Sequence, residues 1–141
     1  MKQKRLMSII SLLLSMTVLC SLPVHAAEIR GSTRIYTSSV TFAQKSNGDF
    51  SIAFSVRATK MMNVIGASSV EIQRNTISGW VTEYTFTPDN TPELQAENRI
   101  QYNTTLTYSP LFVGKEYRAV VMIYVEDAEG MSTQQLTSRT A

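Results

Sequence analysis

Two side chains on which much enzyme chemistry depends are nearly absent from this chain of 141 residues, which has one cysteine, Cys20, and one histidine, His25. Both lie in an N-terminal stretch that we expect to be removed, which would leave the mature chain without thiol, imidazole or disulfide. Nucleophiles that need a neighbouring histidine are then excluded, as are zinc sites built from imidazole or thiolate. We therefore expect no catalytic residue, no metal and no cofactor.

Runs of basic residues are also missing after residue 5. The chain has 13 lysines and arginines against 11 aspartates and glutamates, but Lys2, Lys4 and Arg5 precede the first acidic residue, Glu28. Without those three the count is ten basic against eleven acidic side chains, a formal charge of about −1 at neutral pH. Because both signs are scattered along the chain, we expect no nucleic-acid partner.

The N-terminal stretch has the order of a secretory signal peptide. A basic start is followed by an apolar run over residues 6–22, and Val24 and Ala26 place small residues three and one positions before a cut after Ala26. We therefore expect a signal peptide over residues 1–26, a single domain over residues 27–141, and a secreted, extracellular product.

Two other interpretations of this stretch involve the membrane. A retained anchor would need about 20 strongly apolar residues, whereas the run is interrupted by serines and a threonine and ends at Pro23. Lipid attachment at Cys20 would need a small residue just before it, and Leu19 stands there. Cleavage is the favoured interpretation, with no membrane span in the mature chain.

Apolar residues of the mature part recur at every second position, which is typical of strands with one buried face. The clearest run is residues 50–58, where Phe50, Ile52 and Phe54 alternate with small or polar residues. Asn47-Gly48 just before it suits a tight hairpin turn. Further strands are expected around residues 40–42, 69–74, 80–86, 100–108, 117–126 and 131–137.

Seven short strands with turn signals about every ten residues favour an antiparallel sandwich. Between the second and third strands we expect a crossover loop, in which Met61 and Met62 fill the core. Trp80 shares the spacing of Tyr84 and Phe86, and it is therefore expected in the core rather than on a sugar-binding surface.

Residues 111–117, Leu-Phe-Val-Gly-Lys-Glu-Tyr, resemble the Leu-x-Pro-Gly-x-x-Tyr corner of fibronectin type III modules, with valine in place of the proline. The following strand resembles the penultimate strand of such a module, and residues 69–74 are similar to its third. The resemblance implies that Leu111 caps the core, with Gly114 in the turn, and that the Tyr117 hydroxyl bonds to backbone. The fold class it implies is an all-β, antiparallel, seven-stranded immunoglobulin-like sandwich.

Carboxylates are the remaining candidates for acid/base or calcium chemistry. A hydrolase would need two carboxyls roughly 5 to 10 Å apart across a cleft, and calcium would need several carboxylate or carbonyl oxygens. Charged residues in turns are ordinarily solvated, so we favour the interpretation that these carboxylates are turn residues without a catalytic or calcium-binding role. The acidic residues gather in two groups, Asp89, Glu93 and Glu97, and Glu126, Asp127 and Glu129.

One strand has an unusual outward row. If alternate residues from Tyr117 to Val125 point inward, then Val120, Met122 and Tyr124 point outward, where an antiparallel sandwich normally shows polar residues. Either residues 61–67 or the N-terminal arm cover this row, or it contacts another molecule. We take Val120, Met122 and Tyr124 as the candidate binding residues.

The whole chain also resembles the small exported single-domain proteins of bacteria. The leading hypothesis is a secreted, non-catalytic binding or structural module that contacts another protein or the cell surface, with self-association included. One alternative is a carbohydrate-binding domain, which needs at least two solvent-facing aromatic residues in a row, for instance Tyr124 with Tyr36 or Trp80. The other is a small carboxylate-dependent hydrolase.

Overall fold

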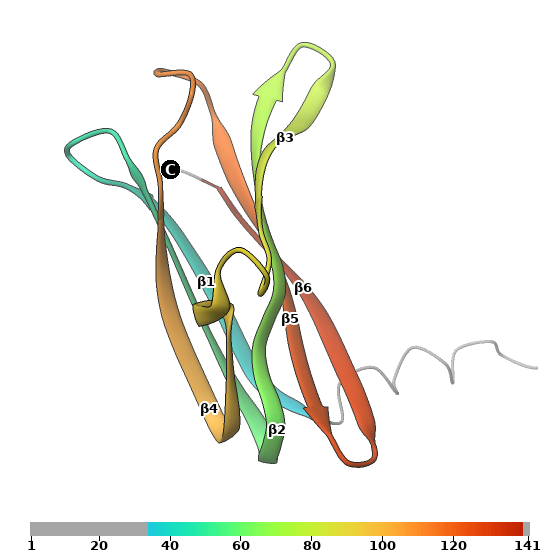
Figure 1. Cartoon of the computed structure of the whole chain (residues 1–141). Coiled ribbons are helices and arrows are strands. Elements are labelled where there is room, and N and C mark those ends of the chain that lie inside the picture. The colour runs from blue at the N-terminus through green and yellow to red at the C-terminus, as the bar shows by residue number, and fades with distance from the viewer. Residues whose placement is uncertain (1–33, 140–141) are drawn as a thin grey trace, which may run out of the picture. The chain divides into compact units, whose positions relative to one another are not determined.

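The structure, a computed structural model, describes residues 34–139. The expected signal peptide and its cleavage site lie outside the described residues. The described part is all-β and antiparallel, as predicted, with one short 3-10 turn, η3 (Pro92–Leu94). Its strands are β1 (Ile35–Gln44), β2 (Phe50–Thr76), β3 (Gly79–Phe86), β4 (Gln95–Tyr108), β5 (Tyr117–Asp127) and β6 (Gly130–Arg139) (Figure 1).

The described residues form six strands rather than the seven expected, because β2 is continuous over 27 residues. The expected loop at residues 61–67 is part of this strand, since Val64 pairs with Glu97 of β4 on one side and with Glu126 of β5 on the other. Met62 is buried as expected, but Met61 is exposed. Backbone pairing at both edges thus satisfies the polar groups that a loop would expose to water.

The two halves of β2 belong to different groups of strands. Its first half pairs with β1 and with most of β4, whereas its second half pairs with β3 and with β5, and β6 follows β5. The start of β4, residues 95–99, pairs with the second half of β2 just beyond the bend. A register shift between Arg57 and Met62 marks the bend between the halves, which lies at the lower end of β2 in Figure 1. The bend curls the sheet around one core.

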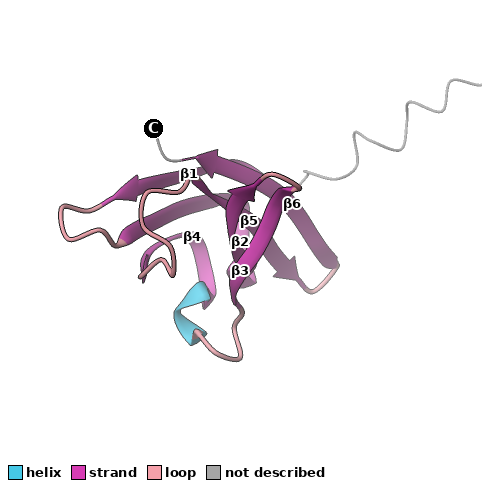
Figure 2. Ribbon diagram, turned by 90° about the horizontal axis from the view of Figure 1, so that it is seen from above, coloured by secondary structure: helices cyan, strands magenta, loops and turns pink. Residues whose placement is uncertain are grey.

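The curl brings the first and last strands near each other. Ser38 of β1 donates a hydrogen bond to the side-chain oxygen of Gln134 in β6 at 2.9 Å, and Figure 2 shows the curled arrangement of the strands from above. Phe50 and Tyr117, from opposite groups of strands, have ring centroids 5.0 Å apart. The two groups therefore share one hydrophobic core.

The core follows the period-two pattern of the sequence. Residues of β5 alternate between buried and half-buried along the whole strand, and alternate residues of β2 from Phe50 to Ala58 are buried. Burying one such side chain stabilises the fold by about 1.5 to 3 kcal/mol. The largest fully buried side chains include Tyr117, Phe54, Ile52, Met62, Ile65, Ile72, Leu94 and Ile123.

Candidate binding surface

The outward row of β5 lies on the face of the sheet opposite the core. Val120, Met122 and Tyr124 are each half-buried, while the residues between them are fully buried. Their cross-strand neighbours are small or polar. These neighbours are Glu71, Ser69 and Gly66 on β2 and Thr137, Gln135 and Thr133 on β6.

Residues 61–67 do not cover this row. Residues 64–67 lie beside β5 in the same sheet, paired edge to edge with residues 123–126, so they cannot also lie over its face. The expectation that residues 61–67 cover the row is therefore wrong. The other candidate cover, the N-terminal arm, lies outside the described residues.

Trp80 belongs to this outer face rather than to the core, which corrects the expectation from its spacing. In the pairing of β2 with β3, Ile72 faces Tyr84 but Gln73 faces Thr82, so one extra residue is accommodated in β3. A bulge of this kind reverses the side-chain alternation beyond it. Phe86 stays buried on the core side, while Trp80 turns to the side of Gln73.

Two arginines lie over the Trp80 ring. The guanidinium carbon of Arg118 is 4.4 Å from the ring centroid, and that of Arg139 is 5.4 Å from it. Cation–π contacts of this kind hold both side chains against the indole. Together with the β5 row they form what we call the outer strip, which consists of Trp80, Arg118, Val120, Met122, Tyr124 and Arg139.

Tyr124 stands at the far end of the outer strip. Its hydroxyl donates a hydrogen bond to the carboxylate of Glu126, and this bond, helped by burial, raises the pKa of Tyr124 above its ordinary value. The hydroxyl is therefore a neutral donor at physiological pH. Tyrosine, tryptophan, arginine and methionine are the residue types enriched at protein interfaces.

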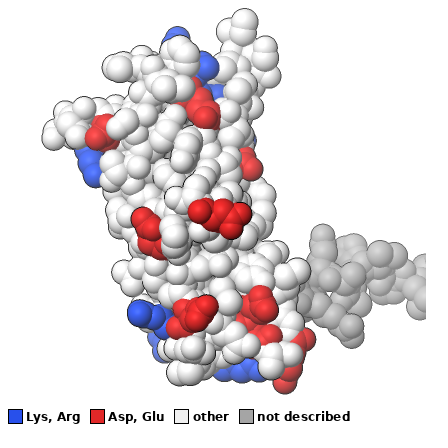
Figure 3. Space-filling view, in the orientation of Figure 1, with Lys and Arg blue, Asp and Glu red and all other residues white. Residues whose placement is uncertain are grey.

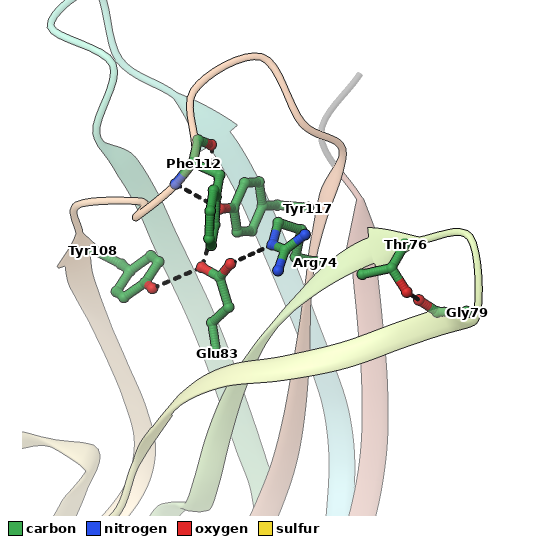
Figure 4. Close-up of polar contacts among 7 residues, drawn as sticks. All are labelled: Arg74, Thr76, Gly79, Glu83, Tyr108, Phe112 and Tyr117. Carbon is green, nitrogen blue, oxygen red and sulfur yellow. Dashed lines mark hydrogen bonds and ion pairs between the residues drawn. The ribbon is translucent and has the colours of Figure 1, made fainter.

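The same bulge turns Glu83 inward, into a buried polar cluster (Figure 4). Its side chain is 5% exposed and forms an ion pair with Arg74 of β2. Tyr108 of β4 and Tyr117 of β5 donate hydrogen bonds to its second carboxylate oxygen, at 3.1 and 3.0 Å. One carboxylate thus receives donors from three other strands.

Both tyrosines of this cluster hold their protons tightly. Burial and the hydrogen bond to Glu83 raise the pKa of Tyr108 to about 12, and the same two causes raise the pKa of Tyr117. Since the carboxylate is stabilised by donors that stay protonated, the arrangement suits a structural tie more than an acid/base site.

The expected corner forms around Tyr117, but Leu111 does not cap the core. The Tyr117 hydroxyl accepts a hydrogen bond from the backbone N–H of Phe112 at 3.3 Å, and Gly114 turns the loop with a φ of +74°. Leu111 is 73% exposed. The neighbouring Phe112 does not cap the core either: its ring centroid is 4.2 Å from the Arg74 guanidinium carbon, so this apolar side chain packs against an arginine.

Beside this corner the surface is hollowed into an open groove of about 540 Å³. Mixed charges line it, and Asn75 donates a hydrogen bond to Glu116 at 2.8 Å across it. Figure 3 shows acidic and basic groups scattered over the face in view, with no continuous basic patch. The groove is lined by Arg74, Asn75, Thr76, Ile77, Gly114, Lys115 and Glu116.

The second acidic group is held by cations at the other end of β5. Asp127 forms ion pairs with Arg34 at 3.1 Å and with Lys60 at 3.0 Å, and Lys60 also reaches Glu129 at 3.4 Å. Burial alone would raise the pKa of Asp127, but Lys60, the backbone N–H of Glu129 and Arg34 together lower it to about 2. No group of three or more histidine, cysteine or acidic residues that could hold a metal ion occurs within residues 34–139.

Sequence reasoning missed Trp80 as a surface residue and Glu83 as a cluster residue, because no residue type marks the bulge at Glu83. Among the residues that the structure describes, no helix has the length and apolar character needed to cross a membrane. Comparison of the chain with protein-family models, with curated proteins and with solved structures finds no match.

Proposed function

We propose that this chain is a secreted immunoglobulin-like module that binds another protein through the outer strip and has no catalytic activity. The observation that carries the proposal is the strip itself: interface-type side chains on the solvent side of a central strand, where antiparallel sheets usually show polar residues.

The pairing order supports the immunoglobulin-like part of the proposal. In such sandwiches the first, second and fifth strands share one sheet, and the third, sixth and seventh share the other. If the two halves of β2 are counted as the second and third strands, then β1, the first half of β2 and β4 take the places of the first, second and fifth strands. The second half of β2, β5 and β6 then take the other set. The resemblance of residues 111–117 to a fibronectin type III corner agrees with this order.

A protein partner is favoured over a polysaccharide because of the Trp80 ring. Sugar binding uses the open face of an aromatic ring, whereas Arg118 and Arg139 both lie over the indole. A hydrolase is disfavoured because the buried carboxylates Glu83 and Asp127 are both held in ion pairs. Fully burying an exposed apolar side chain contributes about 1.5 to 3 kcal/mol. The strip side chains are already half-buried, so each contributes less than this on binding, and the costs of association are subtracted from the sum.

Capture of the partner tests this proposal. The protein, purified from the medium of cells that express the full chain, is immobilised and exposed to extracts of the surface of its producing cells. Bound proteins are then identified by mass spectrometry. We expect Met122→Lys to abolish capture and to leave the thermal midpoint nearly unchanged, because a lysine stem can lie along the same surface with its charge in water.

The matched control is Thr105→Lys, at an exposed position of β4 away from the strip. This variant should capture the same proteins as the wild type. Equal capture by Met122→Lys and by the wild type would contradict the proposal. A strongly lowered thermal midpoint for Met122→Lys would also count against it, since that result indicates a covered side chain.

A further inference from the structure

Two arginines of the outer strip stand directly opposite each other. Arg118 of β5 and Arg139 of β6 are partners in the antiparallel register. Like charges in this position destabilise a sheet. The ion pairs among residues 34–139 involve Arg34, Lys60 and Arg74 as cations, and neither Arg118 nor Arg139.

The positions of both guanidinium groups are nevertheless restrained. Both lie over the Trp80 ring. The Nε of Arg118 also donates a hydrogen bond to the side-chain oxygen of Gln73 at 2.7 Å, and the amide nitrogen of Gln73 donates to Glu71 at 2.8 Å. The terminal N–H groups of Arg118 have no acceptor among the hydrogen bonds of the described residues. A guanidinium group that is already restrained, with donors still available, loses less conformational entropy when it binds an anion.

We propose that Arg118, Arg139 and Trp80 form a binding site for a carboxylate, the acidic side chain of a partner protein. This inference rests on the proposed function, because it names the chemistry of the partner at the same surface. A carboxylate accepts two parallel hydrogen bonds from a guanidinium group, and its negative charge removes the repulsion between the two arginines. Arginine and tryptophan are also the residue types that dominate interface energies.

A single carboxylate fits better here than a more highly charged anion. Glu71 belongs to the same side-chain chain, through Gln73, and its negative charge opposes phosphate or sulfated polymers more than a monovalent group. The mature chain, with a formal charge of about −1, adds no long-range attraction for polyanions. The pair of arginines therefore favours a single carboxylate over a polyanion.

Trp80 offers a direct readout, because it is the only tryptophan of the chain. The exported protein is titrated at low ionic strength with a capped tetraglutamate peptide, and the indole N–H signal is followed by NMR and the fluorescence by emission spectra. A capped tetraglutamine peptide is the uncharged control. We expect a saturable shift with the glutamate peptide alone.

Removing either arginine should weaken this binding by about tenfold or more, the effect of losing a charge-assisted hydrogen bond. The variants are Arg118→Gln and Arg139→Gln. The control is Arg57→Gln, an exposed arginine that lies over Tyr36 at 5.8 Å from the ring centroid, and it should bind as the wild type does. Thermal midpoints of the two strip variants should stay close to that of the wild type, because the loss of contacts to Trp80 and Gln73 is offset by the removal of a like-charge contact.

Three results would overturn the inference: no shift with the glutamate peptide, an equal shift with the glutamine peptide, or an equal loss in Arg57→Gln. Tighter binding of inorganic phosphate than of the glutamate peptide would also overturn it, in favour of a phosphorylated ligand. Failure here is distinguishable from failure of the proposed function. If Met122→Lys still abolishes capture of the partner while the glutamate peptide does not bind, the binding surface stands and its proposed carboxylate chemistry falls.

Discussion

At the scale of single residues, Glu83 connects its own strand with three others. It lies on β3, and its carboxylate receives Arg74 from β2, Tyr108 from β4 and Tyr117 from β5. A buried charge is tolerated only when its hydrogen bonds are made. Without the carboxylate, the Arg74 charge and the two tyrosine hydroxyl groups would lose this partner.

Replacing Glu83 by alanine should lower the free energy of unfolding by about 3 to 5 kcal/mol, because the largely buried Arg74 guanidinium is left without its counter-charge. Urea unfolding followed by circular dichroism measures the change. Glu97→Ala, at an exposed position of β4, is the control and should change stability by no more than about 0.5 kcal/mol. Equal effects of the two substitutions would contradict the structural tie.

Asp127 makes stability depend on acid pH. Its pKa is about 2 in the folded chain and about 3.9 in an unfolded chain, so folding favours the ionised form. The stabilisation is fully present above about pH 4 and is lost as the pH falls from 4 towards 2. Urea unfolding at pH 5, 4, 3 and 2 should show a smaller decline for Asp127→Asn than for the wild type. Identical declines would show that the ion pairs with Arg34 and Lys60 contribute nothing.

At the scale of elements, the continuity of β2 depends on a close backbone approach at Gly66. This residue has a φ of +149°, and a Cβ placed on it would lie 2.1 Å from the carbonyl oxygen of Leu94. Leu94, in η3, is fully buried. The absence of a side chain at Gly66 thus lets the segment before β4 pack against β2.

Gly66→Ala should therefore destabilise the fold more than Gly48→Ala does. Gly48 also has a positive φ, +93°, but nothing lies within 4 Å of its hypothetical Cβ, so its substitution adds backbone strain alone. The additional loss at Gly66 should be about 1 to 3 kcal/mol, the usual effect of forcing an extra carbon into a packed site. Thermal and urea unfolding of both variants give the difference, and equal losses would exclude a close approach.

At the scale of the whole molecule, three features are distributed along β5. The Glu83 cluster lies at its start, beside Tyr117, and the ion pairs of Asp127 lie at its end. Between them the inward face carries the core and the outward face carries the candidate binding residues. Polar and charged contacts hold both ends of β5, and apolar packing holds its inward face. The outer strip therefore lies on a strand that is fixed along its whole length.

The proposed export makes a prediction for the first residue of the released chain. The residues before the cut carry Lys2, Lys4 and Arg5, so cleavage after Ala26 would change the formal charge from +2 to about −1. Mass spectrometry of protein recovered from the medium should find Ala27 or Glu28 as the first residue. Recovery of Met1 would contradict release, and it would return Cys20 and His25 to the list of reactive groups.

The sequence by itself determined the all-β class and most of the core. Period-two alternation is a local property, so the buried faces of residues 50–58 and 117–125 could be predicted without knowing their neighbours. The outward position of Val120, Met122 and Tyr124 followed from the same alternation. That residues 61–67 do not cover these side chains could not be predicted in this way, because it depends on which strand pairs with the edge of β5.

Only the tertiary structure decided the features that depend on partner strands. The bulge opposite Ile72 and Gln73 turned Trp80 outward and Glu83 inward, against the local spacing. Pairing at both edges converted an expected loop into the middle of β2, and Arg74 received Phe112 at a corner where Leu111 was expected to reach the core. The physical reason is common to these cases: side-chain direction within a strand is set by local geometry, whereas register, bulges and edge pairing are set by residues distant in the sequence.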